Sequence, residues 1–126
     1  MKRIGAMTLL VFTVAAVTAS LAFGAHKAQP SKLVGTVGKN DAYKISLNAP
    51  TGKLAKTLKP GTYTFVIHDD STLHNYELDG PHGKSWTFTS VPFKGTKTVT
   101  LKLAAGAYKA YCQPHESMMF QHFTVK

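Results

Sequence analysis

Cysteine is almost absent from this sequence, since Cys112 is the single one among 126 residues. No internal disulfide can form, so an exported domain would have to be held together by its packed core alone. An unpaired thiol in an oxidising compartment is prone to oxidation unless it is buried, paired between chains or bound to a metal. The residues around Cys112 therefore decide how this thiol is used.

Acidic residues are also scarce. The chain has 6 Asp and Glu against 15 Lys and Arg, which gives a formal net charge of +9, and no arginine follows Arg3. The lysines are dispersed and form no clustered basic helix, so we expect a solvated basic surface and no nucleic-acid binding. An acidic partner protein or an anionic membrane surface would suit such a charge equally well.

The N-terminal residues have the pattern of a targeting segment. Lys2 and Arg3 precede an uncharged apolar run at residues 4–23, and the small residues Ala22 and Gly24 stand at its end. This pattern predicts a signal peptide at 1–24, cleaved after Gly24 or after Ala22, and an exported protein of the periplasm or another extracytoplasmic compartment. The alternative is an uncleaved N-terminal anchor, because about 20 apolar residues can cross a bilayer. We expect no membrane span once the signal is removed.

The rest of the chain lacks any long stretch with helical periodicity. A polar linker is expected at residues 25–32 and a single domain at 33–126. Short runs rich in Val, Ile, Thr, Tyr and Phe alternate with Gly, Pro, Asn and Asp, which is typical of an all-β Greek-key sandwich of about eight strands. The predicted strands are Leu33–Val37, Ala42–Leu47, Thr62–His68, His74–Leu78, Ser85–Thr89, Thr96–Leu103, Ala107–Cys112 and His122–Lys126.

Period-two alternation identifies the strand faces that should form the core. It is clearest in three strands, whose inward residues would be Tyr63, Phe65 and Ile67, then Val99, Leu101 and Leu103, then Tyr108, Ala110 and Cys112. The segment 104–106, Ala-Ala-Gly, predicts a tight hairpin between the last two of these strands.

The C-terminal third contains a cluster of soft donor residues. Cys112, His115, Met118 and Met119 place a thiolate, an imidazole and two thioethers within eight residues at the end of a predicted strand. One Cys and two His with a weak axial Met form the donor set of a blue-copper site. The second imidazole must come from a distant segment, and His74, followed by Asn75, is the best candidate.

On these residues the sequence resembles the plastocyanin-like cupredoxins. The resemblance covers about residues 33–126 and rests on Tyr111-Cys112-Gln113-Pro114-His115, on His74-Asn75 and on the segment 60–65, Pro-Gly-Thr-Tyr-Thr-Phe. It implies one type 1 copper bound by His74, Cys112, His115 and an axial methionine. The position of Phe123-Thr124-Val125 favours Met119 as that ligand, with Met118 as the alternative. Gln121 stands where the family usually has glycine, so the loop is expected to be shaped differently.

The resemblance also assigns roles around the ligands. Asn75 would tie the two ligand-bearing segments together by hydrogen bonds. Pro114 has no N–H and cannot donate to the cysteine sulfur, which should raise the reduction potential. His68, His82 and His122 lie outside the pattern, and we expect none of them to bind the metal.

The expected function is single-electron transfer by a monomer whose copper cycles between Cu(I) and Cu(II). Its partners would be redox proteins, acidic ones among them, and no enzymatic activity is expected. The alternative is a copper-binding protein for delivery, storage or resistance, where metal exchange matters more than potential. A Cys-His hydrolase is disfavoured because the cysteine ends a strand and no third catalytic residue is evident.

Overall fold

The computed structural model describes Gly24 and residues 27–126. The predicted signal peptide and its cleavage site, apart from Gly24, lie outside the described residues. No helix in the described part is long and apolar enough to cross a membrane.

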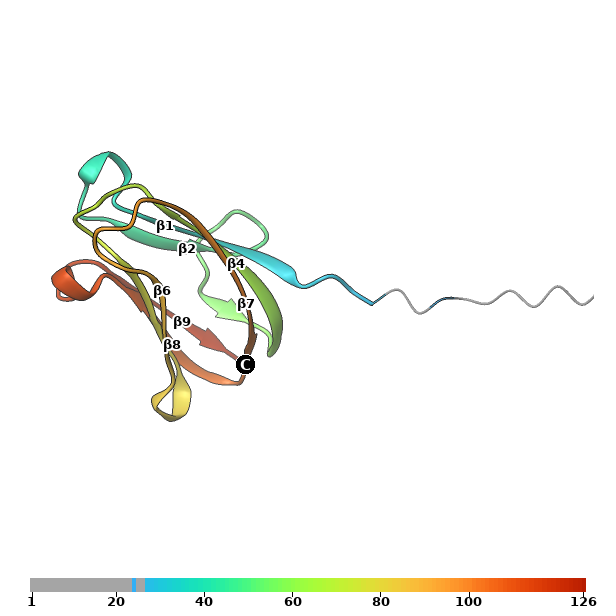
Figure 1. Cartoon of the computed structure of the whole chain (residues 1–126). Coiled ribbons are helices and arrows are strands. Elements are labelled where there is room, and N and C mark those ends of the chain that lie inside the picture. The colour runs from blue at the N-terminus through green and yellow to red at the C-terminus, as the bar shows by residue number, and fades with distance from the viewer. Residues whose placement is uncertain (1–23, 25–26) are drawn as a thin grey trace, which may run out of the picture.

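Two sheets face each other in a sandwich, which confirms the predicted all-β class (Figure 1). The first sheet has the order β2-β1-β4-β7, formed by β2 (Ile45–Asn48), β1 (Ser31–Val37), β4 (Gly61–Asp69) and β7 (Gly95–Leu103). The second has the order β3-β9-β8-β5-β6, formed by β3 (Thr57–Leu58), β9 (Phe120–Val125), β8 (Gly106–Tyr111), β5 (Tyr76–Asp79) and β6 (Ser85–Thr89). Short 3-10 turns lie at η1 (Lys39–Asp41), η2 (Pro81–Gly83) and η3 (Gln113–His115).

Most strand pairs are antiparallel, and the two exceptions involve strands far apart in the sequence. β1 pairs with β4 in parallel from Ser31↔Tyr63 to Val37↔Asp69, and β3 pairs in parallel with β9. β8 lies between β9 and β5, antiparallel to both. This order brings the segment after β4 close to the segment after β8, although about 40 residues of chain separate them.

The core lies between the sheets and contains the predicted faces. Phe65 and Ile67 of β4 are fully buried, as are Ala110 of β8 and Cys112, which directly follows β8. On β7 only Leu103 is fully inside, whereas Val99 and Leu101 are half-buried, because β7 is an edge strand of the first sheet. The alternation therefore identified the inner face correctly, and burial along that face decreases toward the sheet edge.

The structure corrects the prediction in several places. β1 begins at Ser31, inside the predicted linker 25–32, and β2 begins at Ile45 and not at Ala42, which caps η1. Segment 104–106 is not a hairpin, because β7 pairs with β4 and β8 pairs with β5 and β9, so this segment crosses from one sheet to the other. β5 begins at Tyr76, and His74 therefore lies in the preceding turn and not within the strand. β3 is only two residues long, too short to show any periodicity, and was not predicted.

The sandwich has two distinct ends. β1, β4 and β8 all lead into loops at one end, where η1 and η3 lie. The segment before β1 leaves at the opposite end, as Figure 1 shows. We call these the loop end and the tail end.

Candidate metal centre

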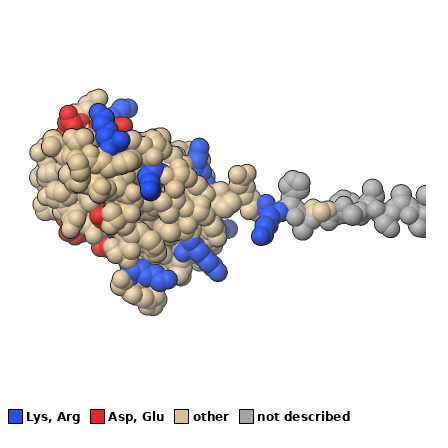
Figure 2. Space-filling model, viewed as in Figure 1, with Lys and Arg blue, Asp and Glu red and all other residues tan. Residues whose placement is uncertain are grey.

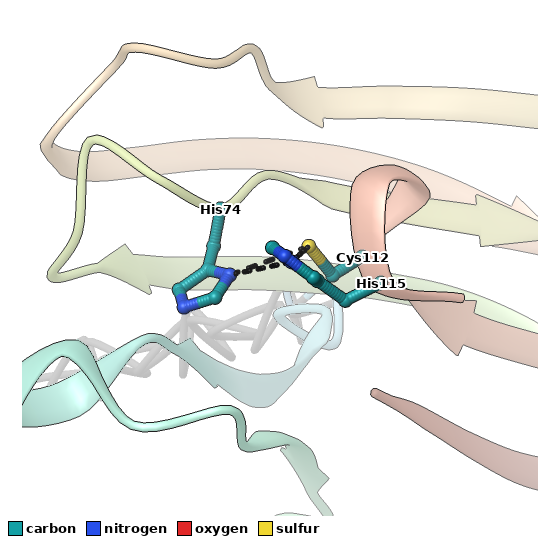
Figure 3. Close-up of side chains that lie close together, drawn as sticks. All are labelled: His74, Cys112 and His115. Atoms are coloured by element: carbon teal, nitrogen blue, oxygen red, sulfur yellow. Dashed lines mark hydrogen bonds between the residues drawn. The ribbon is translucent and has the colours of Figure 1, made fainter. Parts of the chain in front are cut away.

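Three of the predicted donor residues meet at the loop end (Figure 3). His74 lies in the turn between β4 and β5, Cys112 directly follows β8, and His115 ends η3. Within the described chain they form the one group of three His, Cys, Asp or Glu side chains with converging ligand atoms. The sandwich thus brings a residue from mid-chain next to two from the C-terminal loop.

The three ligand atoms form a nearly isosceles triangle. The Nδ1 atoms of His74 and His115 are 3.1 Å apart, and each lies 3.7 Å from Cys112 Sγ. The point equidistant from all three is about 2.0 Å from each, close to the bond lengths that imidazole nitrogen and thiolate sulfur form with first-row metals. The space between these atoms fits one metal ion in trigonal coordination.

The donor types narrow the choice of metal. Two imidazoles with one thiolate in a trigonal arrangement are the set typical of type 1 copper, and soft sulfur suits Cu(I). His74 and Cys112 are fully buried, while His115 is half-buried. Nε2 of His74 has no hydrogen-bond partner within the described residues. Only the His115 side of the centre reaches the surface.

A nearby positive charge would favour the thiolate form of the buried Cys112 side chain. Burial raises its pKa, and the backbone N–H groups of Asn75 and His115 lower it by less. Without compensation the buried sulfur would stay protonated at neutral pH. A coordinated cation supplies that compensation and deprotonates the thiol, so this site is chemically suited to a metal.

Asn75 joins the two ligand-bearing segments through its side chain. Its Oδ1 accepts from the backbone N–H of Gln113 at 2.7 Å, and its Nδ2 donates to Glu77 Oε1 at 2.8 Å. Asn75 is 3% exposed, so these bonds are shielded from water. The hydrogen bonds hold the loop after Cys112 against the turn that carries His74.

The two methionines of the loop differ sharply in burial. Met119 is 0% exposed, whereas Met118 is 61% exposed. The loop is closed by its own backbone, since Cys112 N–H donates to the Met119 carbonyl at 3.0 Å and Met119 N–H donates to the His115 carbonyl at 2.8 Å. Pro114 is exposed within η3.

Sequence reasoning missed Tyr43, which precedes β2. Its ring contacts both imidazoles edge-on, with centroids 5.2 Å from His74 and 4.7 Å from His115. Tyr43 is 53% exposed, so one side faces solvent while the other covers the centre. No pattern around Tyr43 indicates this role, because only the fold brings this turn to the ligands.

Gly38 was missed as well, although glycine after a strand is a recognisable signal. Its φ of 66° is left-handed, and a Cβ there would lie 2.5 Å from Ser71 Cβ and 2.8 Å from His74 Cδ2. Glycine is therefore required both by the backbone and by the close approach to the ligand.

Asp69, the last residue of β4, adds a buried carboxylate near the centre. It is 0% exposed, and burial raises its pKa, while the Thr89 hydroxyl, the Ser71 N–H and the charge of His74 lower it. The other histidines lie apart from the cluster. His68, for example, pairs with Thr96 through a 3.0 Å contact on the outer face of the first sheet.

Comparison with known proteins shows which solved structures share this arrangement of strands. No protein-family model and no curated protein sequence matches the chain. Among solved structures, reduced rusticyanin superposes with a TM-score of 0.54 at 18% identity, covering 80% of this chain and 82% of that one. Auracyanin A, a "blue" copper protein from Chloroflexus aurantiacus, has a TM-score of 0.52 at 21% identity, covering 78% of this chain and all of its own.

A rusticyanin from Thiobacillus ferrooxidans gives a TM-score of 0.50 at 21% identity, with 75% of this chain and 76% of that chain covered. These identities are low, so the likeness concerns the arrangement of strands. The protein has the cupredoxin fold.

Proposed function

We propose that this protein is a type 1 copper protein that carries single electrons between redox partners. The observation that supports it most directly is the buried triangle of two imidazole nitrogens and one sulfur, spaced for one trigonal ion. When bound, copper would supply a one-electron couple between Cu(I) and Cu(II). The residues around the site would bind the ion, hold the ligands in place and limit the access of water.

These residues are suited to keeping the site unchanged during electron transfer. His74 and Cys112 are fully buried, and Asn75 fastens their two segments together. Tyr43 lies over the imidazoles and limits the access of water. A site that is already arranged needs little movement when the metal gains or loses an electron.

We assign the axial position to Met119, with Met118 as the alternative. Met119 is buried within the loop that carries Cys112 and His115, whereas Met118 faces solvent. A weak thioether donor in that place would tune the relative affinity for the two oxidation states.

The cellular setting is a separate part of the proposal and rests on the targeting pattern of the N-terminal residues. We infer an exported protein that works as a monomer with redox proteins outside the cytoplasm and has no enzymatic activity of its own. A copper oxidase or nitrite reductase would need further copper sites and domains, for which a domain of about a hundred residues has no room.

A second candidate is copper delivery or storage. The exposed thioether of Met118, next to the ligand loop, is the observation that favours it, because such a donor could receive Cu(I) from another protein. In that case exchange of the ion would matter more than its potential.

The visible absorption and midpoint potential of the Cu(II)-loaded protein distinguish the two. Electron transfer requires an intense thiolate-to-copper band near about 600 nm, reversible bleaching by a reductant, and loss of the band in Cys112→Ser. A colourless protein that binds Cu(I) tightly without a reversible couple would instead establish copper handling.

A further inference from the structure

We propose that the tail end of the sandwich is a docking surface for an anionic lipid membrane. The proposal concerns the part of the molecule opposite the metal centre and goes beyond the proposed function. It rests on where charges, apolar side chains and the N-terminal segment lie.

Strand pairing identifies the residues of the tail end. The start of β4 pairs with the end of β7 at Gly61↔Leu103, and the start of β8 pairs with the end of β9 at Gly106↔Val125. The short connections 59–60 and 104–105 join the two sheets at this same end. Three exposed lysines lie here or within one residue of it: Lys59, Lys102 and Lys126. A fourth, Lys32 of β1, pairs with Thr64, three residues from the start of β4.

Most acidic side chains lie away from the tail end. Asp41, Asp69, Asp70 and Glu116 are at the loop end and Glu77 is on β5, while Asp79, the last residue of β5, pairs with Lys109 three residues from the start of β8. Figure 2 shows the same separation, with acidic atoms only on the half of the visible face that is farther from the tail. At the loop end Lys109 is paired with Glu116, and the exposed lysines Lys39, Lys44 and Lys94 are offset by the other acids. The loop end is therefore close to neutral, and the net positive charge lies at the tail end and along the rest of the sandwich, where Lys53, Lys56, Lys84 and Lys97 are also exposed.

Large exposed apolar side chains, unlike the lysines, are missing from the tail-end connections of the described chain. Large exposed hydrophobic residues in the described part are Tyr43, Leu54, Leu73, Val91, Met118 and Phe120, and none belongs to the tail-end connections. Protein interfaces usually depend on aromatic and arginine side chains in pockets. The tail end offers only lysines, whose ammonium groups are well hydrated and suit the diffuse negative potential of anionic lipid headgroups.

The N-terminal segment supports lipid as the partner. The chain before β1 leaves the molecule at the tail end and adds exposed Lys27 there. In the uncleaved form, the apolar run 4–23 would enter the bilayer and hold this end of the molecule near the lipid surface. Docking at this end would direct the loop end, with His115 and Tyr43, away from the membrane and toward a soluble partner.

Charge-reversal variants of the full chain test this surface. Lys59→Glu/Lys102→Glu/Lys126→Glu alters the tail end, and Lys39→Glu/Lys44→Glu/Lys94→Glu changes the net charge equally at the loop end. Binding is measured by co-sedimentation with vesicles of phosphatidylcholine alone and of phosphatidylcholine with phosphatidylglycerol. The difference between the two vesicle types isolates the electrostatic contribution from any contribution of the apolar run.

We expect phosphatidylglycerol to increase the vesicle affinity of the wild type. In the tail-end variant this increase should be at least about tenfold smaller. The loop-end variant should keep most of it, and about 0.5 M salt should abolish it in all three proteins. Acetylation by a water-soluble reagent, read by mass spectrometry, should show Lys59, Lys102 and Lys126 protected by the vesicles, with Lys39 and Lys44 still reactive.

Three results would overturn the proposal. An equal loss of vesicle affinity in the two variants would mean that only the net charge matters. If phosphatidylglycerol did not increase the affinity of the wild type, the proposed docking surface would not exist. Binding to soluble polyglutamate as tight as to the vesicles, with the same protected lysines, would point to an acidic protein in place of a membrane. None of these readouts depends on copper, so they stand apart from the test of electron transfer.

Discussion

The side-chain amide of Gln121 hydrogen-bonds both backbone polar groups of Leu47. Leu47 N–H donates to Oε1 at 2.8 Å, and Nε2 donates to the Leu47 carbonyl at 3.0 Å and to the Ala55 carbonyl at 2.9 Å. Leu47 belongs to β2 at the edge of the first sheet, and Gln121 belongs to β9 in the second. One side chain thus joins the edge strand of the first sheet to β9 of the second.

Replacing Gln121 should therefore cost stability. Gln121→Leu removes three hydrogen bonds and leaves the N–H of buried Leu47 without its partner, while the Leu47 carbonyl still accepts from the Ala55 N–H; the expected loss is about 1–3 kcal/mol. Urea denaturation of the metal-free protein measures it. His122→Leu, at the exposed neighbouring position, serves as the control and should change the unfolding free energy by less than about 0.5 kcal/mol. Equal effects of the two substitutions would show that the amide contributes nothing special.

The axial assignment predicts different effects for the two methionines. Met119→Leu keeps the volume of a fully buried side chain but removes its sulfur, so the midpoint potential should rise by at least about 60 mV, a tenfold change in relative affinity for the two oxidation states. Met118→Leu is the matched control and should leave the potential unchanged. Voltammetry of the copper-loaded proteins decides, and a shift in the Met118 variant alone would reverse the assignment.

Replacing Pro114 should shift the midpoint potential in the opposite direction. Pro114→Ala restores an N–H in η3 that can donate to the Cys112 sulfur, and a further hydrogen bond to the thiolate stabilises Cu(II). The midpoint potential should fall. Ser117→Ala, in the same loop and also exposed, should not change it. An unchanged potential in Pro114→Ala would disprove the effect.

The position of Tyr43 over the two imidazoles indicates that its ring limits access to the metal. Tyr43→Ala uncovers the imidazoles of His74 and His115, so a chelator should remove copper at least about tenfold faster, in line with the loss of two aromatic contacts. Tyr43→Phe keeps the ring and should behave like the wild type. Stopped-flow bleaching of the visible band with excess chelator measures the rate, and a similar acceleration in both variants would assign the effect to the hydroxyl.

Glu77 predicts a pH dependence of stability. Burial raises the pKa of this carboxyl above its usual value, the neighbouring charge of Asp79 adds to the rise, and hydrogen bonds from Thr87 and Asn75 oppose it. A carboxyl with a raised folded-state pKa favours the folded state at low pH and loses that contribution as the pH rises through the folded-state pKa.

Glu77→Gln stays neutral at every pH and can still accept from Asn75 while donating to Thr87. The substitution should therefore raise the melting temperature of the metal-free protein at pH 7, and the gain should disappear below about pH 4, where the wild-type carboxyl is protonated in both states. Thr87→Val removes one opposing hydrogen bond and should lower stability. A constant difference between wild type and Glu77→Gln across this range would contradict the role of burial.

The sequence predicted those parts of the fold whose signals are local. Alternation in Tyr63, Phe65 and Ile67 marked the inner face of β4 because every second residue of that strand lies in the core. The close spacing of Cys112 and His115 marked a donor cluster because both belong to one loop. His74 was identified by its resemblance to a family pattern, and the sandwich brings it to the same loop.

Features that depend on which sheet a strand joins were not predictable in this way. The segment 104–106 has a hairpin composition, but the pairing of β7 with β4 decides that it crosses between sheets. Tyr43 has no sequence signal, since its contacts are made 31 and 72 positions along the chain, at His74 and His115. Gln121 was recognisable as unusual, and only its partners Leu47 and Ala55 explain it.

The loop between β8 and β9 shapes itself. Its backbone bonds from Cys112 to Met119 and from Met119 to His115 are internal, and the two strands meet just outside it at Tyr111↔Phe120. From outside the loop, the sandwich constrains the two ends of this segment, the Gln113 N–H that Asn75 binds, and the His115 ring that meets His74 and Tyr43. A loop of another length could be grafted between the same two strands, so the colour and potential of the centre are separable from the architecture that carries it.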